Sequence, residues 1–212
     1  MSIKNHRWLR ASASQMHSSF TKAPERDGSN NPKGHYMLMR KRDLRSVGGG
    51  HSEMALNNQH RELYLKHSYK SCVMQFDYFI RTPDQYFIAV RFGTEIYDLS
   101  PVYTVAHQAD TGGWRKANVH IGPQYSPFFV DIDGYQAIMG GLVAVDNVRF
   151  INCSLPSPPK SGGCPASRPV TCTRSRICVT EDDVCDGVRD CGYDDLSDEN
   201  GCSGRPICTF NS

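Results

Sequence analysis

The chain has 212 residues, of which 39% are hydrophobic and 22% charged, a composition typical of a soluble globular protein. Its net charge is +2, and its basic side chains form no stripe with interleaved aromatics, so we expect no nucleic-acid partner. No stretch approaches the roughly 18 consecutive apolar residues of a transmembrane helix, and the opening MSIKNHRWLR lacks the apolar run of a signal peptide.

The first three quarters of the chain alternate apolar and polar residues with a period of two, which is typical of half-buried β-strands. In residues 72–80, one face carries Cys72, Met74, Phe76, Tyr78 and Ile80, and the other carries Gln75 and Asp77. No long amphipathic helix is evident, and Gly- and Pro-containing turns separate the segments. The pattern predicts a mainly β domain, an antiparallel sandwich, with strands at 35–39, 62–65, 72–80, 86–92, 102–106, 117–121, 128–132 and 142–150.

Residues 154–163, SLPSPPKSGG, are rich in Pro, Ser and Gly and predict a linker. We therefore expect a larger domain at 1–153, a small module at 164–202 and a tail at 203–212.

The small module contains six of the nine cysteines and few large apolar residues, too few for a core that offsets chain entropy. Disulfides or a metal must hold it. Zinc sites usually pair cysteines two to four residues apart or mix them with histidine, and this stretch does neither. Disulfides are favoured, and they imply an oxidising compartment. The simplest reconciliation with the missing signal is that the chain is a piece of a longer secreted or membrane-anchored protein.

Four segments of the larger domain form an ordered set: GHYMLM at 34–39, SCVMQFDY at 71–78, GW at 113–114 with ANVHI at 117–121, and GLVAVDNVRF at 141–150 followed by Cys153. Together they resemble the MAM family, an adhesion module of meprins, neuropilins and receptor tyrosine phosphatases. The resemblance implies a two-sheet jelly-roll sandwich and a Cys72–Cys153 disulfide; two free, buried thiols are the alternative. The family opens with a cysteine-containing strand for which residues 1–4 offer no counterpart, so we expect that first strand to be missing.

The small module resembles a low-density-lipoprotein-receptor class A repeat, through CDGVRDC at 185–191 and SDE at 197–199 followed by Cys202. The resemblance implies three disulfides, Cys164–Cys178, Cys172–Cys191 and Cys185–Cys202. It also implies a calcium site.

The chemistry of the acidic residues favours the same cation. Residues 164–202 hold nine acidic and four basic side chains, and clustered carboxylates repel one another unless a cation neutralises them. Calcium accepts about six to eight oxygens in irregular geometry. The expected side-chain ligands are Asp186, Asp190, Asp198 and Glu199, and the family pattern adds the backbone carbonyls of Asp183 and Val188. An acidic surface without metal is the alternative.

The module departs from the family pattern in two places. Asp183 stands where many ligand-binding repeats carry an aromatic residue that packs on a partner's lysine, so we expect weaker lysine docking. The segment 192–196 is about two residues longer than usual, and Tyr193 or Leu196 is a candidate to replace part of the lost apolar contact.

Two further residues carry expectations. Cys208 is followed by TFNS, which resembles the opening of a second MAM domain, so its partner would lie outside this chain; an unpaired thiol is the alternative. Asn152 begins an Asn-Cys-Ser sequon, a weak candidate for glycosylation.

No catalytic motif is visible, so we expect no enzyme. The expected function is an extracellular binding, adhesion or receptor fragment whose module contacts protein ligands with basic patches. The alternative is a non-catalytic accessory region of a membrane-bound protease or phosphatase.

Overall fold

The computed structural model describes residues 6–19, 23–41, 50–55, 67–81, 86–93, 102–107, 110–136, 142–160 and 163–202. They fall into two compact units. The first comprises Met1–Tyr64, Met74–Val119 and Phe128–Phe150, and the second Leu65–Val73, His120–Pro127 and Ile151–Ser212. The second unit therefore combines the cysteine module with two segments from the region that precedes the linker.

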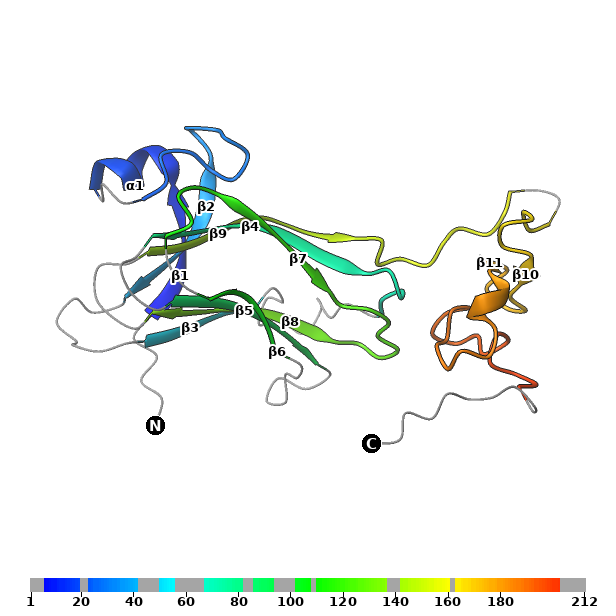
Figure 1. The fold of residues 1–212 in the computed structure, drawn as a ribbon. Helices are drawn as coiled ribbons and strands as arrows, with labels where there is room; N and C mark the ends of the chain where they lie inside the picture. The colour runs from blue at the N-terminus through cyan, green and yellow to red at the C-terminus, as the bar shows by residue number, and fades with distance from the viewer. Residues whose placement is uncertain are drawn as a thin grey trace. The chain divides into compact units, whose positions relative to one another are not determined.

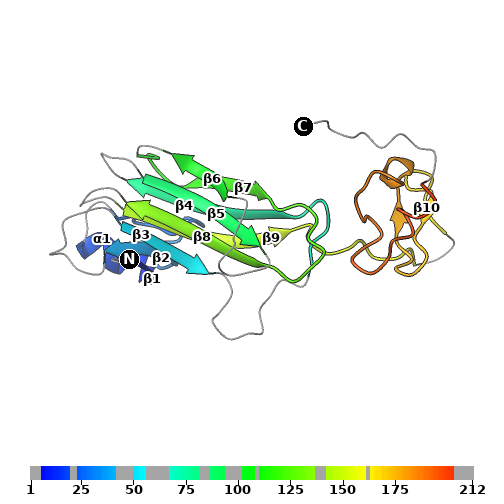
Figure 2. The same cartoon turned by 90° about the horizontal axis from the view of Figure 1, so that it is seen from below.

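Two antiparallel sheets form the first unit, and Figure 1 shows them as two layers. The five-stranded sheet has the order β1 (His6–Ser12), β2 (His35–Lys41), β9 (Leu142–Ile151), β4 (Val73–Arg81) and β7 (Arg115–His120). The four-stranded sheet, seen in Figure 2, has the order β3 (Gly50–Ala55), β8 (Phe129–Gln136), β5 (Tyr86–Gly93) and β6 (Val102–His107). The predicted fold class, mainly β with a two-sheet antiparallel sandwich and a small disulfide-rich module, is confirmed.

The inner faces of the two sheets pack closely enough to require a small residue at one point. A Cβ on Gly134 of β8 would lie 2.6 Å from the sulfur of Met39 and 3.0 Å from the ring of Trp8, both in the opposite sheet. Around this contact the core is built from fully buried side chains of both sheets, among them Met74, Phe76, Ile80, Ile88, Val90, Val130, Ile132, Val143 and Val145.

The outer face of the five-stranded sheet is also covered, which the strand pattern does not predict. The helix α1 (Ala13–Ser19) follows β1, and its Ala13 and Met16 pack in one cluster with Tyr36, Leu38 and Phe79. Asp77, expected on the open face of β4, is buried because the loop 23–34 covers it, and the Asn147 amide donates to its carboxylate at 2.7 Å. The strand is thus buried on both faces along part of its length.

This loop also explains two residues of the MAM-like motifs. A Cβ on Gly34 would meet the Asp27 carboxylate at 1.6 Å, so only glycine fits there. Trp114 contacts the rings of Tyr36 and Phe79, at 5.6 and 5.7 Å between centroids, and its Nε1 donates to the Arg26 carbonyl at 2.8 Å.

The second unit has little regular structure. It contains the two-residue strands β10 (Val170–Thr171) and β11 (Cys178–Val179), paired antiparallel, and the short helix η1 (Glu181–Asp183). Its apolar cluster is small, Cys172, Ile177, Val179 and Cys191 with Leu155 and Val170 at the edge. Three disulfides supplement it: Cys164–Cys178, Cys172–Cys191 and Cys185–Cys202, the pairs implied by the class A resemblance. Closing loops of 14 to 19 residues stabilises the fold by about 3 kcal/mol each.

The segments 67–73 and 120–127 of this unit are joined to each other and to Cys153. Ser68 and Gln124 exchange backbone hydrogen bonds at 3.0 and 3.1 Å, and the Tyr69 amide donates to the Cys153 carbonyl at 2.9 Å. The Cys72–Cys153 disulfide, the pair implied by the MAM resemblance, fixes the same place covalently.

Seven of the eight predicted strands correspond to β2, β4, β5, β6, β7, β8 and β9. The eighth, at 62–65, lies outside the described residues. The strands β1 and β3 were not predicted. Residues 1–5, where the family's first strand was expected to be missing, are also not described, and the first strand described is β1, at the edge of its sheet.

Candidate functional site

The loop from Cys185 to Cys202, here called the acidic loop, carries the four predicted side-chain metal ligands and the predicted carbonyl ligand of Val188. Its first turn is tight: Cys185 and Gly187 have positive φ values of 64° and 86°, a conformation that suits glycine best. The Asp186 carboxylate accepts the Val188 amide at 2.8 Å, and the Cys185 amide donates to the Asp198 carbonyl at 3.0 Å. These bonds and the terminal disulfide bring the two ends of the loop together.

Two carboxylates of the acidic loop accept backbone amides with one oxygen and leave the other without a partner. Asp198 Oδ2 accepts the amides of Asp190 and Cys191, and Glu199 Oε2 accepts the Gly187 amide at 3.1 Å. Asp198 Oδ1, Glu199 Oε1 and Asp190 Oδ2 are inaccessible to solvent and have no hydrogen-bond partner among the described residues. Buried carboxylate oxygens without partners are costly, and a nearby positive charge or protonation would offset that cost.

The electrostatics of Asp190 point the same way. Its side chain is fully buried, and burial raises its pKa to about 6, with the neighbouring carboxylates of Asp183 and Asp186 adding to the effect and Lys70 opposing it. A carboxyl group whose charged form is this unfavourable gains most from a nearby cation.

The donor set fits a hard, oxygen-binding cation. Asp183, Asp186 and Asp190 each place a carboxylate oxygen within 4.8 Å of the others, and the Asp190 amide donates to the Asp198 carboxylate. All donors are oxygens, which calcium and magnesium prefer. A second acidic group, Asp195 with Cys172 and Cys191, cannot bind a metal through sulfur because those cysteines form a disulfide.

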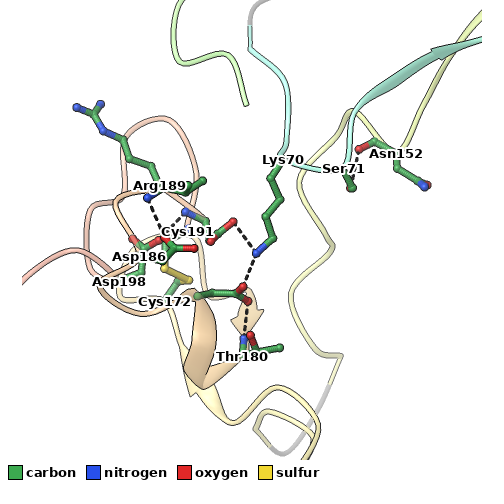
Figure 3. Close-up of polar contacts among 12 residues, drawn as sticks. Lys70, Ser71, Asn152, Cys172, Thr180, Asp186, Arg189, Cys191 and Asp198 are labelled. Carbon is green, nitrogen blue, oxygen red and sulfur yellow. Dashed lines mark hydrogen bonds and ion pairs between the residues drawn. A yellow bond between two sulfur atoms is a disulfide. The ribbon is translucent and has the colours of Figure 1, made fainter. Parts of the chain in front are cut away.

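Sequence reasoning missed Lys70, which contacts this site from the segment 67–73. Its ammonium forms an ion pair with the Asp183 carboxylate and lies 3.0 Å from Asp190 Oδ1. Figure 3 shows its side chain extending toward the loop that carries Asp186 and Asp198. Burial alone would lower the pKa of Lys70, but its hydrogen bonds to Asp183 and Asp190 raise it above the ordinary value. No local signal marks a contact between residues 113 positions apart.

Asp195 was also missed, and its role is structural. Its side chain is buried, and one carboxylate oxygen accepts the amides of Arg174 and Ser175 at 2.8 Å while the other accepts the Ser197 amide at 3.1 Å. Burial opposes ionisation, but these bonds prevail and lower its pKa to about 2. Asp195 therefore ties the turn after β10 to the acidic loop and is an anion at neutral pH.

Aromatic contacts flank the acidic loop. The Arg189 amide donates to the Tyr125 hydroxyl at 3.0 Å, and the Arg189 guanidinium lies 5.1 Å above the Tyr125 ring. His67 stacks on Tyr193 with ring centroids 6.0 Å apart. Tyr193 is 51% exposed and Leu196 42%, so both side chains keep a large part of their surface in solvent and neither replaces the absent aromatic residue as a buried contact.

The two remaining predictions stay open. Asn152 is exposed at a positive φ of 54°, and its carbonyl accepts the Ser71 hydroxyl at 3.1 Å (Figure 3). Its glycosylation stays a prediction. Cys208 lies outside the described residues.

Solved structures with low sequence identity resemble parts of the chain. TmCBM61, in a complex with β-1,4-galactotriose, has 6% identity over 68% of this chain and 88% of its own, with a TM-score of 0.37. A tailspike protein of bacteriophage CBA120 has 8% identity over 69% and 19%, with a TM-score of 0.37. A Cry1Da core variant of Bacillus thuringiensis has 10% identity over 58% and 19%, with a TM-score of 0.27. At these scores none bears on function.

Among the described residues, no helix has the length and apolar character to cross a membrane. The model of the MAM domain, meprin/A5/mu, matches residues 2–154, which is most of the chain. MAM domains are in general extracellular adhesion and protein-interaction domains. This chain belongs to the MAM domain family.

Proposed function

We propose that residues 164–202 form a low-density-lipoprotein-receptor class A repeat that binds one calcium ion, and that the chain is an extracellular binding or adhesion fragment of a membrane-anchored or secreted protein. The observation that carries this proposal is the set of three solvent-inaccessible carboxylate oxygens, on Asp190, Asp198 and Glu199, that lack hydrogen-bond partners among the described residues. The three disulfides explain why the module keeps these carboxylates close despite their repulsion.

In this proposal the ion is held by the side chains of Asp186, Asp190, Asp198 and Glu199 and by the carbonyls of Asp183 and Val188. When bound, it supplies positive charge to the buried oxygens and cross-links the two ends of the acidic loop. The residues themselves shape the site: Asp198 is oriented by two backbone amides and Glu199 by one. The exposed carboxylates around it then present a negative surface to basic patches on protein partners.

Calorimetry on the oxidised full chain tests the metal site. We expect about one calcium per chain, and we expect Asp198→Ala to weaken binding by about a hundredfold or more, because it removes one ligand and the anchor of two amides. Asp182→Ala is the matched control, since Asp182 is an exposed neighbour with the same charge. Absence of calcium heat from wild type with its disulfides intact contradicts the proposal, as does equal loss in both variants.

A further inference from the structure

The acidic loop already has a lysine in contact with it, and that lysine belongs to the same chain. Lys70 Nζ bridges the carboxylates of Asp183 and Asp190, and the Lys70 side chain keeps 34% of its surface exposed. The Lys70 carbonyl lies at hydrogen-bond distance, 3.1 Å, from His120 Nε2, which fixes the backbone at this residue. Lys70 is therefore held at its side-chain ammonium and at its backbone carbonyl.

Asp183 is positioned for this contact by its own helix. In η1 its Oδ2 accepts the Thr180 amide at 2.7 Å, which turns Oδ1 toward Lys70. An aromatic residue at position 183 could offer a lysine only its ring face, whereas a carboxylate offers a full ion pair. Asp183 therefore offers no aromatic ring to the aliphatic part of a lysine, but it offers a carboxylate to the ammonium group.

Neighbouring contacts hold the same segments against the module. Tyr125 binds the Arg189 amide and packs under its guanidinium, and His67 stacks on Tyr193. Because Lys70 is tethered by the chain, its effective concentration at the acidic loop is far above that of a free ligand, on the order of millimolar or more. A lysine that would bind the loop only weakly as a separate molecule is then docked in a large fraction of the chains.

We propose that Lys70 is an internal ligand of the acidic loop: it occupies the position that a lysine of a basic protein partner would take, and a partner must displace it to bind. The displacement part of this proposal rests on the proposed function, in which the acidic loop binds basic partners. A partner can bind only the fraction of chains in which Lys70 is not docked. The apparent dissociation constant of the partner is therefore its intrinsic value divided by that fraction. Release of Lys70 makes the site available.

Amine acetylation of the full chain, quantified at each lysine by mass spectrometry, tests whether Lys70 is docked. The docked amine must leave the carboxylates of Asp183 and Asp190 before it can attack the reagent, so we expect Lys70 to react about threefold to tenfold more slowly in wild type than in Asp183→Asn. The exposed Lys33 and Lys160 serve as internal references in every sample. Asp182→Asn, which removes a neighbouring charge, should leave the Lys70 rate within about twofold. Equal Lys70 rates in wild type and Asp183→Asn would overturn the docking.

Calorimetric titration with a pentalysine peptide tests the displacement. We expect Lys70→Gln to bind the peptide about threefold to tenfold more tightly than wild type, and Lys33→Gln, which changes net charge equally, to bind as wild type does. Equal affinity of Lys70→Gln and wild type would overturn the shared site. No binding by any variant, with calcium heat still present, would overturn the displacement and the proposed basic-ligand function, while slow Lys70 acetylation would still support the docking.

Discussion

At the scale of single residues, the module depends on carboxylates that have different roles. Asp190, Asp198 and Glu199 keep oxygens for which the described part of the chain offers no hydrogen-bond partner, as expected of metal ligands. Asp195, in contrast, uses both oxygens to accept backbone amides and is buried. Its place three residues before Asp198 gives no hint of this difference, because hydrogen bonding to residues 174 and 175 is set by the fold. The prediction for Asp195 therefore concerns stability and not binding.

We expect Asp195→Asn to destabilise the module by about 1–3 kcal/mol, since one of the two accepting oxygens is replaced by an NH2 group that faces a backbone N–H donor. Hydrogen exchange measured at the amides of Arg174, Ser175 and Ser197 should accelerate about tenfold or more. Asp194→Asn is the control: Asp194 is mostly exposed and its carboxylate pairs with the exposed Arg174, so exchange should change less than about twofold. Unchanged protection in Asp195→Asn would contradict the structural role.

The pH dependence of Asp195 follows from the direction of its pKa shift. The folded-state pKa of about 2 lies below the unfolded value of about 3.9, so its contribution to stability is complete above about pH 4 and is lost as the pH falls toward 2. The same amides should thus lose protection in wild type between about pH 4 and 2. In Asp195→Asn this part of the acid dependence should be absent, because the substituted side chain does not titrate.

At the scale of elements, the sequence predicts best where both the alternation and the burial are strong. The strands β4 and β9 lie inside the five-stranded sheet, contain several buried side chains each, and were expected within one residue of their observed ends. The edge strand β1, HRWLRAS, has only Trp8 and Leu9 as large apolar residues, so its alternation is too weak to detect. The buried Asp77 was unpredictable for another reason: the loop that covers it is distant in sequence.

The residues of the candidate site also differ in how well the sequence predicts them. The acidic loop was predictable because its cysteines and carboxylates lie within 18 residues of one another. Lys70, Tyr125 and His67 reach it from other segments, and nothing local marks them.

The disulfides give a prediction at this scale, because two of them close loops of similar length but only one encloses the metal ligands. Cys185–Cys202 spans 17 residues and Cys164–Cys178 spans 14, so their chain-entropy contributions are similar, about 3 kcal/mol each. We expect the Cys185→Ser, Cys202→Ser double variant to lose calcium affinity by about tenfold more than the Cys164→Ser, Cys178→Ser variant. Calorimetry on both full-length variants measures this. Equal losses would show that the metal ligands do not depend on closure of the acidic loop.

At the scale of the whole molecule, the two compact units have separate cores and different means of stabilisation. The first has two packed sheets, whereas the second has a small apolar cluster and disulfides. Both tryptophans, Trp8 and Trp114, belong to the first unit. Tryptophan fluorescence therefore reports on the first unit alone, and calorimetry reports on both.

This distribution allows calcium to be assigned to one unit. A ligand present at about 100 times its dissociation constant stabilises the state that binds it by about 2.7 kcal/mol, which raises the melting temperature of a small unit by about 10 °C or more. We expect calcium to raise one calorimetric transition by that amount and to move the tryptophan-fluorescence midpoint by less than about 2 °C. Asp198→Ala should abolish the calorimetric shift, and Asp182→Ala should retain it. An equal rise of both signals would contradict separate cooperative units, because calcium bound in the second unit would then stabilise the sheets of the first.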